Sequence, residues 1–526
     1  MPSSLLKVMT SGIQDQRIYT LKTLYPFVKI WYKVSRYTTK WVRLDFDSAP
    51  EFGRTAYARL QRKGHLITRL FLVSNMPDII TIQEEAQAIA NRTYFPLGVT
   101  VYPKFGWTNS LGHALVERLF LDIGGTRVEQ IDSRLLEVLD EYNTPLEKVT
   151  VVNRLLPRND STFANPKIPP YNESSFMSKN TRSVVPLPFW FTRGDSACAL
   201  PIDAILADEV RVGVTFRNIQ GLYYTGSRNL NNTSLDQGTG LWPLLSTPFY
   251  AKLTTPSSIT LPGLDITDLS AKFVQVEGIK MPSQLFIGET YLLAEYIFLD
   301  QPEANRLRLA DIQVPIVQHY ALNPLDTEGL PRVILPLDVP NPTRDLFWMV
   351  QRVEAPTYNN FFIASRDLRT PGPQYVNGYL PLWWPNAIGL NAQSPDSLLP
   401  GFATRDSEPI KALAIIYEGT LVRARTENPA LFRSILPSYQ QKKTPWLWRY
   451  YYNFSFGIKN GTTPFSKPNG SANLDKIKKR EMYIEFNPNS GCTNPNDVPK
   501  YVVYCWAETY NIFRVFGGRA GCMFAY

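Results

Sequence analysis

Apolar and polar residues alternate along several segments of this chain. In residues 41–47, three apolar side chains (Val42, Leu44 and Phe46) are separated by charged ones. The same period of two recurs in three further segments, which are 210–217, 333–337 and 481–486. Because successive side chains of a strand point to opposite faces of a sheet, this period predicts strands with one buried face. Such strands lie in both halves of the chain, which predicts an all-β protein built from sandwiches.

One β-hairpin is predicted by its turn. Residues 119–128 carry Gly124-Gly125 between two strand-like runs. A two-residue hairpin turn requires positive φ angles, which glycine adopts at little steric cost. The sequence therefore predicts a hairpin here, with His113 at the start of the strand that leads into it.

Two short helices are expected among the strands. Asp132-Ser133 can cap a helix over 133–142, which would end near Asn143-Thr144-Pro145. A second helix is expected to begin at Asp300, with Pro302 in its first turn and Leu307 facing inward.

Three stretches rich in Pro, Asn, Ser, Thr and Gly predict long loops, at roughly 143–183, 218–250 and 354–410. The third contains Trp383-Trp384, and apolar side chains in so long a loop indicate packing within the subunit or against a neighbour. The stretch 218–250 separates two blocks of strands, and the predicted domain boundary lies in it.

Composition agrees with this architecture. A chain of 526 residues is too long for one ordinary core, so at least two domains are expected. Its 42 prolines disfavour long helices, and an aromatic content of 13% favours half-buried strands. With 44% hydrophobic and 19% charged residues, the chain is not predominantly disordered.

The N-terminal segment is basic. Residues 1–60 hold ten Lys or Arg and four Asp or Glu, in a chain whose formal net charge is +9. Such a segment suits an anionic surface such as lipid head groups or nucleic acid, and an ordinary solvated surface explains the modest excess equally well. The first residues lack the apolar core of a signal peptide, and the longest apolar runs fall far short of the roughly 20 residues that span a bilayer. We therefore expect a soluble protein made in the cytosol.

Residue types that catalyse reactions or bind metals are sparse. No two of the three histidines (His65, His113 and His319) have metal-ligand spacing, so each is expected to be a surface or packed residue. The four cysteines form no CxxC pair, which argues against a zinc ribbon and suits a reducing compartment. Neither a GxSxG motif nor a Walker phosphate loop is present. The glycine-rich residues 517–521 have no helix after them, so we interpret them as a flexible or tightly packed tail.

Two carboxylate pairs and one basic run complete the candidates. Asp45/Asp47 and Asp208/Glu209 suggest a glycosidase only weakly, because solvated pairs are far commoner. The basic run 476–480 precedes a strand and is interpreted as a guard of a sheet edge or a solvated loop. The sequence therefore predicts no enzymatic activity: no catalytic, cofactor-binding or metal-binding residue, and no cofactor.

Nine blocks, spread in order over both halves of the chain, carry a further signal; they lie at 12–20, 27–39, 62–68, 112–128, 187–191, 199–202, 208–212, 296–307 and 507–525. In this order they resemble the major capsid proteins of the nucleocytoplasmic large DNA viruses. Each block alone is weakly specific, and their colinearity is specific. Two positions depart from the family's pattern, since His65 stands where an Asp is usual and Asp208 where a His is usual.

The resemblance implies an all-β double jelly roll, made of two consecutive eight-stranded sandwiches with long loops and a few short helices. The expected organisation is an N-terminal arm (1–27), a first jelly roll (28–217), a linker (218–239) and a second jelly roll (240–526) with its long loop around 354–410. It also implies a homotrimer that forms a pseudo-hexagonal capsomer of an icosahedral double-stranded DNA virus.

The implied partners are further copies of the chain, neighbouring capsomers, and minor capsid, cement and penton proteins. An internal membrane is expected near the basic N-terminal arm, and no sequence-specific nucleic acid is expected. The implied location is the outer shell of the virion, after synthesis and assembly in the host cytoplasm.

Two alternative functions remain open at this point. One is another double jelly-roll assembly protein, such as a penton or a membrane scaffold. The other is a jelly-roll protein that binds or hydrolyses carbohydrate.

Overall fold

The fold was analysed in a computed structural model of the chain. It describes residues 37–77, 102–108, 110–158, 182–228, 250–251, 274–275, 285–353, 355–358, 361–362, 364, 366, 408–445, 449–458, 460–461, 468–488 and 498–524. The expected N-terminal arm, Trp383-Trp384 and most of the three long loops lie outside these residues.

The segments with a period of two form strands whose apolar side chains point inward. In β8 (Val210–Phe216) and β21 (Glu481–Phe486), buried positions alternate with less buried ones along most of each strand. β15 (Arg332–Pro336) alternates strictly between exposed and buried residues. In β1 (Tyr37–Asp45), Leu44 is buried and its two charged neighbours are exposed. The strands predicted from the alternation are confirmed.

The first sandwich consists of two four-stranded antiparallel sheets. One has the order β1-β12-β3-β7 and the other β2-β8-β5-β6. Besides β1 and β8, its strands are β2 (Thr55–Arg59), β3 (Leu66–Asn75), β5 (Val116–Ile123), β6 (Thr126–Asp132), β7 (Arg182–Pro186) and β12 (Thr290–Leu299). Numbered along the chain within the sandwich, the two orders are 1-8-3-6 and 2-7-4-5.

The second sandwich repeats this topology. Its sheets have the orders β13-β22-β16-β19 and β15-β21-β17-β18, which again correspond to 1-8-3-6 and 2-7-4-5. Its further strands are β13 (Ile312–Ala321), β16 (Pro342–Arg352), β17 (Ile410–Tyr417), β18 (Leu421–Thr426), β19 (Tyr451–Ser455) and β22 (Tyr501–Phe516). Two eight-stranded sandwiches with this order are a double jelly roll, so the predicted fold class is confirmed.

The predicted domain boundary needs a correction. β12 (Thr290–Leu299) pairs with β1 and β3, so it completes the first sandwich and does not belong to the second. The chain passes to the second sandwich through α8 (Gln301–Leu309), and β13 then starts at Ile312. The sequence analysis placed the linker at 218–239, within the loop-rich stretch 218–250, but the strand pairing places the change of sandwich after Leu299.

The remaining described elements are short. The strands are β4 (Tyr102–Trp107), which pairs with β9 (Tyr223–Arg228), β10 (Tyr250–Ala251), which pairs with β11 (Val274–Gln275), and β14 (Leu325–Asp326), β20 (Ala472–Asn473) and β23 (Arg519–Cys522). The helices are α4 (Leu111–Leu115), α5 (Ser133–Asn143), α6 (Val149–Leu155), α11 (Leu436–Tyr439) and seven single-turn elements: η1 (Leu146–Lys148), η2 (Trp190–Thr192), η3 (Ser196–Cys198), η4 (Ile219–Gly221), η5 (Ala355–Tyr358), η6 (Leu431–Ile435) and η7 (Leu474–Lys476).

The local predictions are mostly confirmed. Gly124 and Gly125 form the β5–β6 turn with positive φ angles, and α5 and α8 occupy the two predicted helical segments. Of the two interpretations of residues 517–521, the packed one holds, because Gly517 and Gly518 form the turn between β22 and β23. The placement of His113 was wrong: it lies in α4, just before β5, where its side chain is buried.

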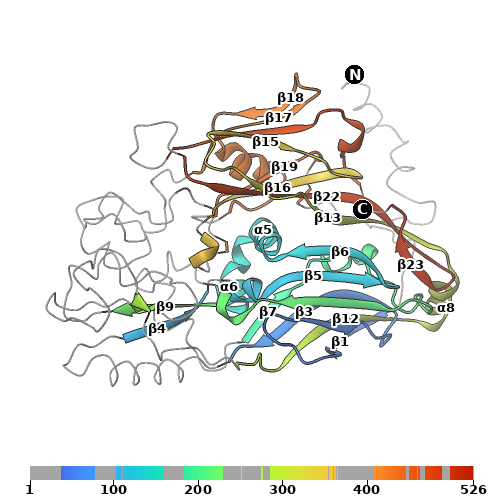
Figure 1. The fold of residues 1–526 in the computed structure, drawn as a ribbon. Helices are drawn as coiled ribbons and strands as arrows, with labels where there is room; N and C mark the ends of the chain where they lie inside the picture. The colour runs from blue at the N-terminus through green and yellow to red at the C-terminus, as the bar shows by residue number, and fades with distance from the viewer. Residues whose placement is uncertain are drawn as a thin grey trace, which may run out of the picture.

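The two sandwiches lie one above the other in the view of Figure 1, with α5 between them. β5 and β6 of the first sandwich and β13, β16 and β22 of the second face this junction. β16 is buried at every position except its two ends, because one of its faces lines the second core and the other lies at the junction.

Candidate functional site: the junction between the two sandwiches

Helix α5 is the centre of the junction. Asp132 caps its N-terminus by accepting a hydrogen bond from the backbone N–H of Leu135 at 2.7 Å. Leu135, Leu136 and Leu139 are buried, as the sequence analysis expected. Glu137 and Glu141 are buried as well, although charged residues are almost never fully buried without partners. The partners of these carboxylates are therefore the next question.

Glu137 is held by groups from several parts of the chain. Its Oε2 lies 2.6 Å from Nδ1 of His113 and accepts a hydrogen bond from Arg158 at 2.7 Å. Its Oε1 accepts from the Ser110 hydroxyl at 3.0 Å and lies 3.1 Å from Nε of Arg449. The Glu137, His113, Arg158 and Arg449 side chains are at most 2% exposed. We use the name α5 cluster for the charged residues that meet around α5, which are Glu137, Asp140, Glu141, His113, Arg158, Lys443 and Arg449.

The second sandwich supplies two cations to the α5 cluster. Arg449 donates to Oε1 of Glu141 at 2.9 Å, and Nζ of Lys443 lies 3.2 Å from Oε2 of the same carboxylate. Both residues belong to the segment between α11 and β19. Tyr142 adds a neutral contact by donating its hydroxyl to the backbone carbonyl of Tyr451 at 2.7 Å. Charges of opposite sign thus meet from the two sandwiches in a place without water access.

The cations of the α5 cluster keep the Glu137 and Asp140 carboxylates ionised. Burial raises the pKa of Glu137, but Arg158, Arg449 and His113 outweigh burial and hold the pKa well below its usual range. Burial likewise raises the pKa of Asp140, and Arg158, which donates to its Oδ2 at 2.6 Å, gives a lowered net pKa.

A second group of buried charges joins β6 to β13 and β22. Nδ1 of His319 on β13 lies 2.7 Å from Oε1 of Glu129 on β6. Nε2 of His319 lies 3.5 Å from Oε1 of Glu508 on β22, and Arg193 approaches the same oxygen to 2.8 Å. Glu129 and Arg193 come from the first sandwich and the other two from the second. We call these four residues the His319 cluster.

The His319 cluster favours a charged imidazole. Burial lowers the pKa of His319, but its contacts with Glu129 and Glu508 outweigh this, so the net pKa is raised. Burial raises the pKa of Glu508, whereas Arg193, His319 and Arg344 lower it, and the net pKa is well below the ordinary value. His319 and Glu508 therefore stabilise each other's charged forms, whereas the Arg193 guanidinium stabilises the Glu508 carboxylate and opposes the charge on His319.

Hydrogen bonds and ring contacts extend the junction beyond the two clusters. The indole N–H of Trp506 donates to Oδ2 of Asp132 at 3.0 Å, and Arg134 donates to Gln351 at 3.1 Å. In addition, the Trp190 and Phe513 rings have centroids 5.4 Å apart. The junction thus combines apolar packing with polar contacts over several strands.

The candidate carboxylate pairs have structural partners. Asp45 is exposed and pairs with Arg43 at 2.7 Å. Asp208 accepts from the backbone N–H of Ala520 at 2.8 Å, which fastens the β22–β23 hairpin to the first sandwich. Glu209 pairs with Arg59 and Arg211. Arg211, which pairs with Glu209, also interacts electrostatically with Asp47, so one carboxylate of each pair acts on the same cation.

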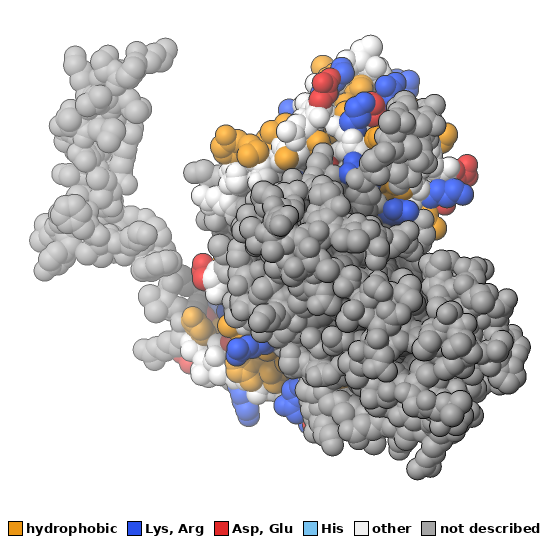
Figure 2. All heavy atoms as spheres, turned by 90° about the vertical axis from the view of Figure 1, so that its left-hand side faces the viewer, with side chains coloured by type: hydrophobic (Ala, Val, Ile, Leu, Met, Phe, Trp, Pro, Cys, Tyr) orange, Lys and Arg blue, Asp and Glu red, His pale blue; other side chains and the backbone are white. Residues whose placement is uncertain are grey.

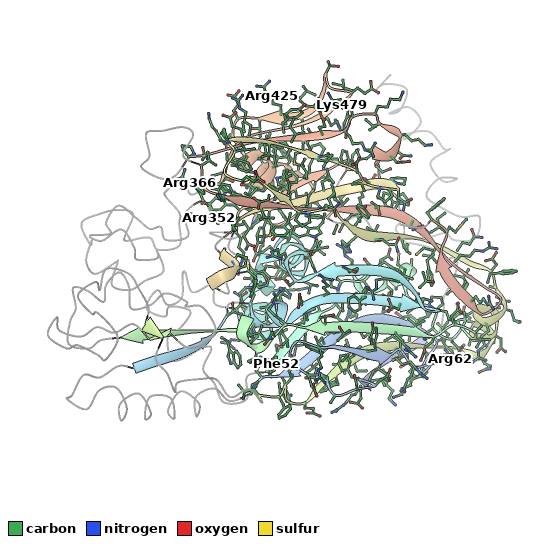
Figure 3. The ribbon with its side chains drawn as sticks, viewed as in Figure 1. Phe52, Arg62, Arg352, Arg366, Arg425 and Lys479 are labelled. Atoms are coloured by element: carbon green, nitrogen blue, oxygen red, sulfur yellow. The ribbon has the colours of Figure 1, made fainter. Side chains whose placement is uncertain are left out.

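The remaining candidates are His65 and the basic run 476–480, and each has its own surroundings. His65 accepts a hydrogen bond from the backbone N–H of Leu299 at 2.8 Å, far in sequence from the other two histidines. The basic run 476–480 precedes β21, which is an inner strand, so it does not guard a sheet edge. Its Lys479 is exposed at the outer rim of the second sandwich, near Arg425 (Figure 3), as a solvated loop requires.

Among the described residues, no group of three or more His, Cys, Asp or Glu side chains could hold a metal ion. In the same residues, every helix is too short or too polar to cross a membrane. The three described cysteines (Cys198, Cys505 and Cys522) are free thiols.

Sequence analysis missed the junction residues because their partners are distant in the chain. Glu137 and Arg449 are 312 positions apart by residue number, and His319 and Glu129 are 190 apart. One local signal was available. That signal was misleading, because Glu137, Asp140 and Glu141 lie at helical spacing beside the leucines, which indicates an ordinary amphipathic helix with a solvated charged face.

Family models and related proteins agree on the identity of the fold. The model of the N-terminus of the major capsid protein matches residues 23–238, and the model of the major capsid protein of large eukaryotic DNA viruses matches residues 310–521. Together they extend over most of the chain. The chain belongs to this family of major capsid proteins. It is a structural protein of a viral capsid.

Two distant relatives match most of the chain. The major capsid protein of Rana tigrina ranavirus is 21% identical over 97% of this chain and 93% of its own. Probable capsid protein 4 of Acanthamoeba polyphaga mimivirus is 21% identical over 72% of this chain and 79% of its own.

Two solved structures share the fold. The VP54 protein of PBCV-1 superposes with a TM-score of 0.62 at 15% identity, covering 95% of this chain and all of that one. The Faustovirus major capsid protein gives a TM-score of 0.62 at 10% identity, covering 96% of this chain and 94% of that one. The fold is thus retained at identities where sequence comparison alone is weak.

Proposed function

We propose that three copies of this chain assemble into a pseudo-hexagonal capsomer that tiles the outer shell of an icosahedral virion. The observation that carries the proposal is the junction, where buried ion pairs fix two similar jelly rolls to each other. A rigid pair of similar sandwiches contributes two of the six units of a near-hexagon, so three copies complete it.

The outward faces of the two outer sheets are suited to contact other copies. On the first sandwich, Tyr37 and Trp41 of β1 are 65% and 43% exposed. On the second, Ile334 of β15 and Val422 of β18 are 47% and 48% exposed. Subunit interfaces have an apolar centre, which such side chains can supply, and a polar rim. Figure 2 views the molecule from the left-hand side of Figure 1 and shows apolar side chains beside lysine and arginine side chains on the described part of the second sandwich at that end.

Light scattering coupled to size-exclusion chromatography tests the assembly. We expect a stable particle with three times the 59.9 kDa mass of one chain. A folded monomer at micromolar concentration would contradict the proposal.

Variants of the outer faces sharpen this experiment. We expect Ile334→Lys and Trp41→Lys to weaken the trimer while the monomer keeps its secondary structure, because each places a charge in an apolar contact. Leu309→Lys is the matched control, since Leu309 is 88% exposed at the end of α8, away from both outer sheets.

We further propose that minor capsid, cement and penton proteins bind the capsomer and that the basic N-terminal arm lies toward an internal membrane. In this proposal the chain is made and assembled in the host cytoplasm, and it is not an enzyme. Protein stoichiometry of purified virions distinguishes this function from that of a penton or a membrane scaffold. A major capsid protein dominates the particle, whereas a protein found only at the vertices is rare.

A further inference from the structure

A lysine is buried in the second sandwich, beside the junction. Only 3% of the Lys442 side chain is exposed. Its Nζ lies 3.0 Å from Oδ1 of Asp345 and 3.2 Å from Oδ1 of Asn453. The Phe347 ring centroid is 4.7 Å from the same nitrogen. An amine, a carboxylate and a primary amide therefore meet in a site closed to water.

The strand register brings these groups together. β16 and β19 are antiparallel neighbours, with Phe347 opposite Asn453 and Asp345 opposite Ser455. Asp345, Phe347 and Asn453 consequently lie on one face of the sheet, because residues two apart on a strand point the same way. Lys442 reaches this face from the segment between α11 and β19.

We propose that Lys442 and Asn453 become joined by an intramolecular amide bond, with Asp345 as the base of the reaction. This bond goes beyond the capsid function and does not depend on trimer formation. It requires no oxidant, cofactor or second protein.

The reaction balances with the three side chains alone. The Lys442 ammonium transfers a proton to the Asp345 carboxylate, and the neutral amine adds its lone pair to the Asn453 Cγ. The protonated Asp345 donates a hydrogen bond to the oxygen anion that forms, and then passes its proton to Nδ2. The Cγ–Nδ2 bond breaks and releases ammonia, which takes up the proton that Nζ loses and leaves as an ammonium ion. One ammonium and one primary amide are thereby converted into a secondary amide and a free ammonium ion, with Asp345 returned to its carboxylate form.

Neighbouring contacts orient both reacting partners. Nδ2 of Asn453 donates to the backbone carbonyl of Leu346 at 3.0 Å, which turns the amide carbonyl toward Lys442. Asn460 donates to Oδ2 of Asp345 at 3.1 Å, which leaves Oδ1 facing the lysine. Fixed, water-free placement of this kind replaces the entropy cost of bringing reactants together.

The electrostatics of the site also favour the amide. Arg344 lies 3.6 Å from Oδ2 of Asp345, so two buried cations share this carboxylate. Conversion of Lys442 to an amide removes one of these charges and leaves Asp345 with Arg344. Removal of a buried charge relieves its desolvation cost.

The bond would tie down the segment that holds the sandwiches together. Lys443 and Arg449 both pair with Glu141 of α5. In the sequence, both lie between Lys442 and Asn453. A covalent link from Lys442 to β19 closes this segment into a loop and restrains both cations at the junction.

Mass spectrometry of the purified full-length protein tests the proposal. We expect the denatured chain to be lighter than its sequence mass by one ammonia, and a digest to contain a branched peptide that joins Lys442 to Asn453. Succinimide formation at an Asn-Gly step, such as Asn460-Gly461, causes the same mass loss but yields no branched peptide.

Matched variants assign the chemistry. Lys442→Arg keeps the cation next to Asp345 but cannot form the amide, so the branched peptide should disappear. Lys443→Arg, one residue away, should retain it. Asp345→Asn removes the base at nearly constant shape and should leave Lys442 unbonded in a folded chain. Absence of the branched peptide from the unsubstituted protein would overturn the proposal and leave the three side chains as a buried ion-pair network.

Discussion

Buried charges determine the character of this molecule at the scale of single residues. Glu137 accepts hydrogen bonds from Ser110 and Arg158 and pairs with Arg449 and His113. Replacing such a network with apolar residues is often neutral, but removing one carboxylate leaves the buried cations with one counter-charge fewer. Glu137 is therefore important because its loss would remove a counter-charge from buried cations.

Glu137→Gln should lower the free energy of unfolding by about 3 kcal/mol, because it leaves Arg158 and Arg449 without their shared carboxylate. Denaturant unfolding of the purified protein measures the loss. Glu147→Gln is the control, since Glu147 is exposed in η1, close to α5 in sequence, and its replacement should change stability by less than about 0.5 kcal/mol. Equal effects of the two substitutions would contradict the structural role of Glu137.

Single residues were also the scale at which prediction from sequence was weakest. The alternation of Val42, Leu44 and Phe46 reports burial locally, because the neighbours that matter are two positions away. A buried charge such as His319 has no local pattern, since its partner Glu129 lies on another strand of another sandwich. The sequence therefore indicated that His319 was surface or packed, and only the fold showed which contacts it makes.

At the scale of elements, strands and turns were predictable from the sequence, but the sandwich to which a strand belongs was not. Two glycines with positive φ were enough to place the β5–β6 turn. β12, in contrast, has an apolar pattern that fits either sandwich. β12 pairs with β1, whose residues lie about 250 positions earlier. This pairing depends on which strands of the folded sheets still have an unpaired edge. A loop-rich stretch such as 218–250 was thus mistaken for a domain linker.

The cap of α5 provides a test at this scale. Asp132→Ala should destabilise the protein by about 2 kcal/mol, because it removes both the helix cap and the acceptor for the Trp506 indole. Thermal unfolding with tryptophan fluorescence as the readout follows both effects. Asp132→Asn retains an acceptor oxygen for the cap and should be milder; if it is as damaging as Ala, the cap is not what Asp132 contributes.

For the whole molecule, the junction makes two sandwiches behave as one body. Four sheets are stacked with α5 in the middle (Figure 1). Buried charged groups from both sandwiches meet there. Double jelly-roll architecture and the capsid family were predictable because many short blocks keep their order along the chain. The orientation of the sandwiches was not, since it depends on contacts between residues from opposite ends of the sequence.

The junction should respond to pH through the His319 cluster. A raised histidine pKa means that its stabilisation is fully present below the ordinary value of 6.5 and is lost as the pH rises through the folded-state value. Glu508, with a lowered pKa, acts in the opposite direction: its stabilisation is present above 4.5 and is lost at more acidic pH. We therefore expect the melting temperature to fall between neutral and alkaline pH.

Melting temperatures of His319→Gln, measured over the same pH range, should show a smaller fall. His65→Gln, which lies outside the junction, should behave like the unsubstituted protein. If His319→Gln retains the full alkaline decrease, the titrating group lies elsewhere in the chain.

The order of strands within each sheet has a consequence for synthesis on the ribosome. In both sandwiches the last strand to be translated, β12 or β22, occupies an inner position between the first strand and the third. The first sandwich of a nascent chain cannot be completed until Leu299 has left the ribosomal exit tunnel. Until then, β1 and β3 have unpaired backbone edges that can pair with other chains. We therefore expect a chaperone that covers β1 and β3 during translation to reduce aggregation of this chain.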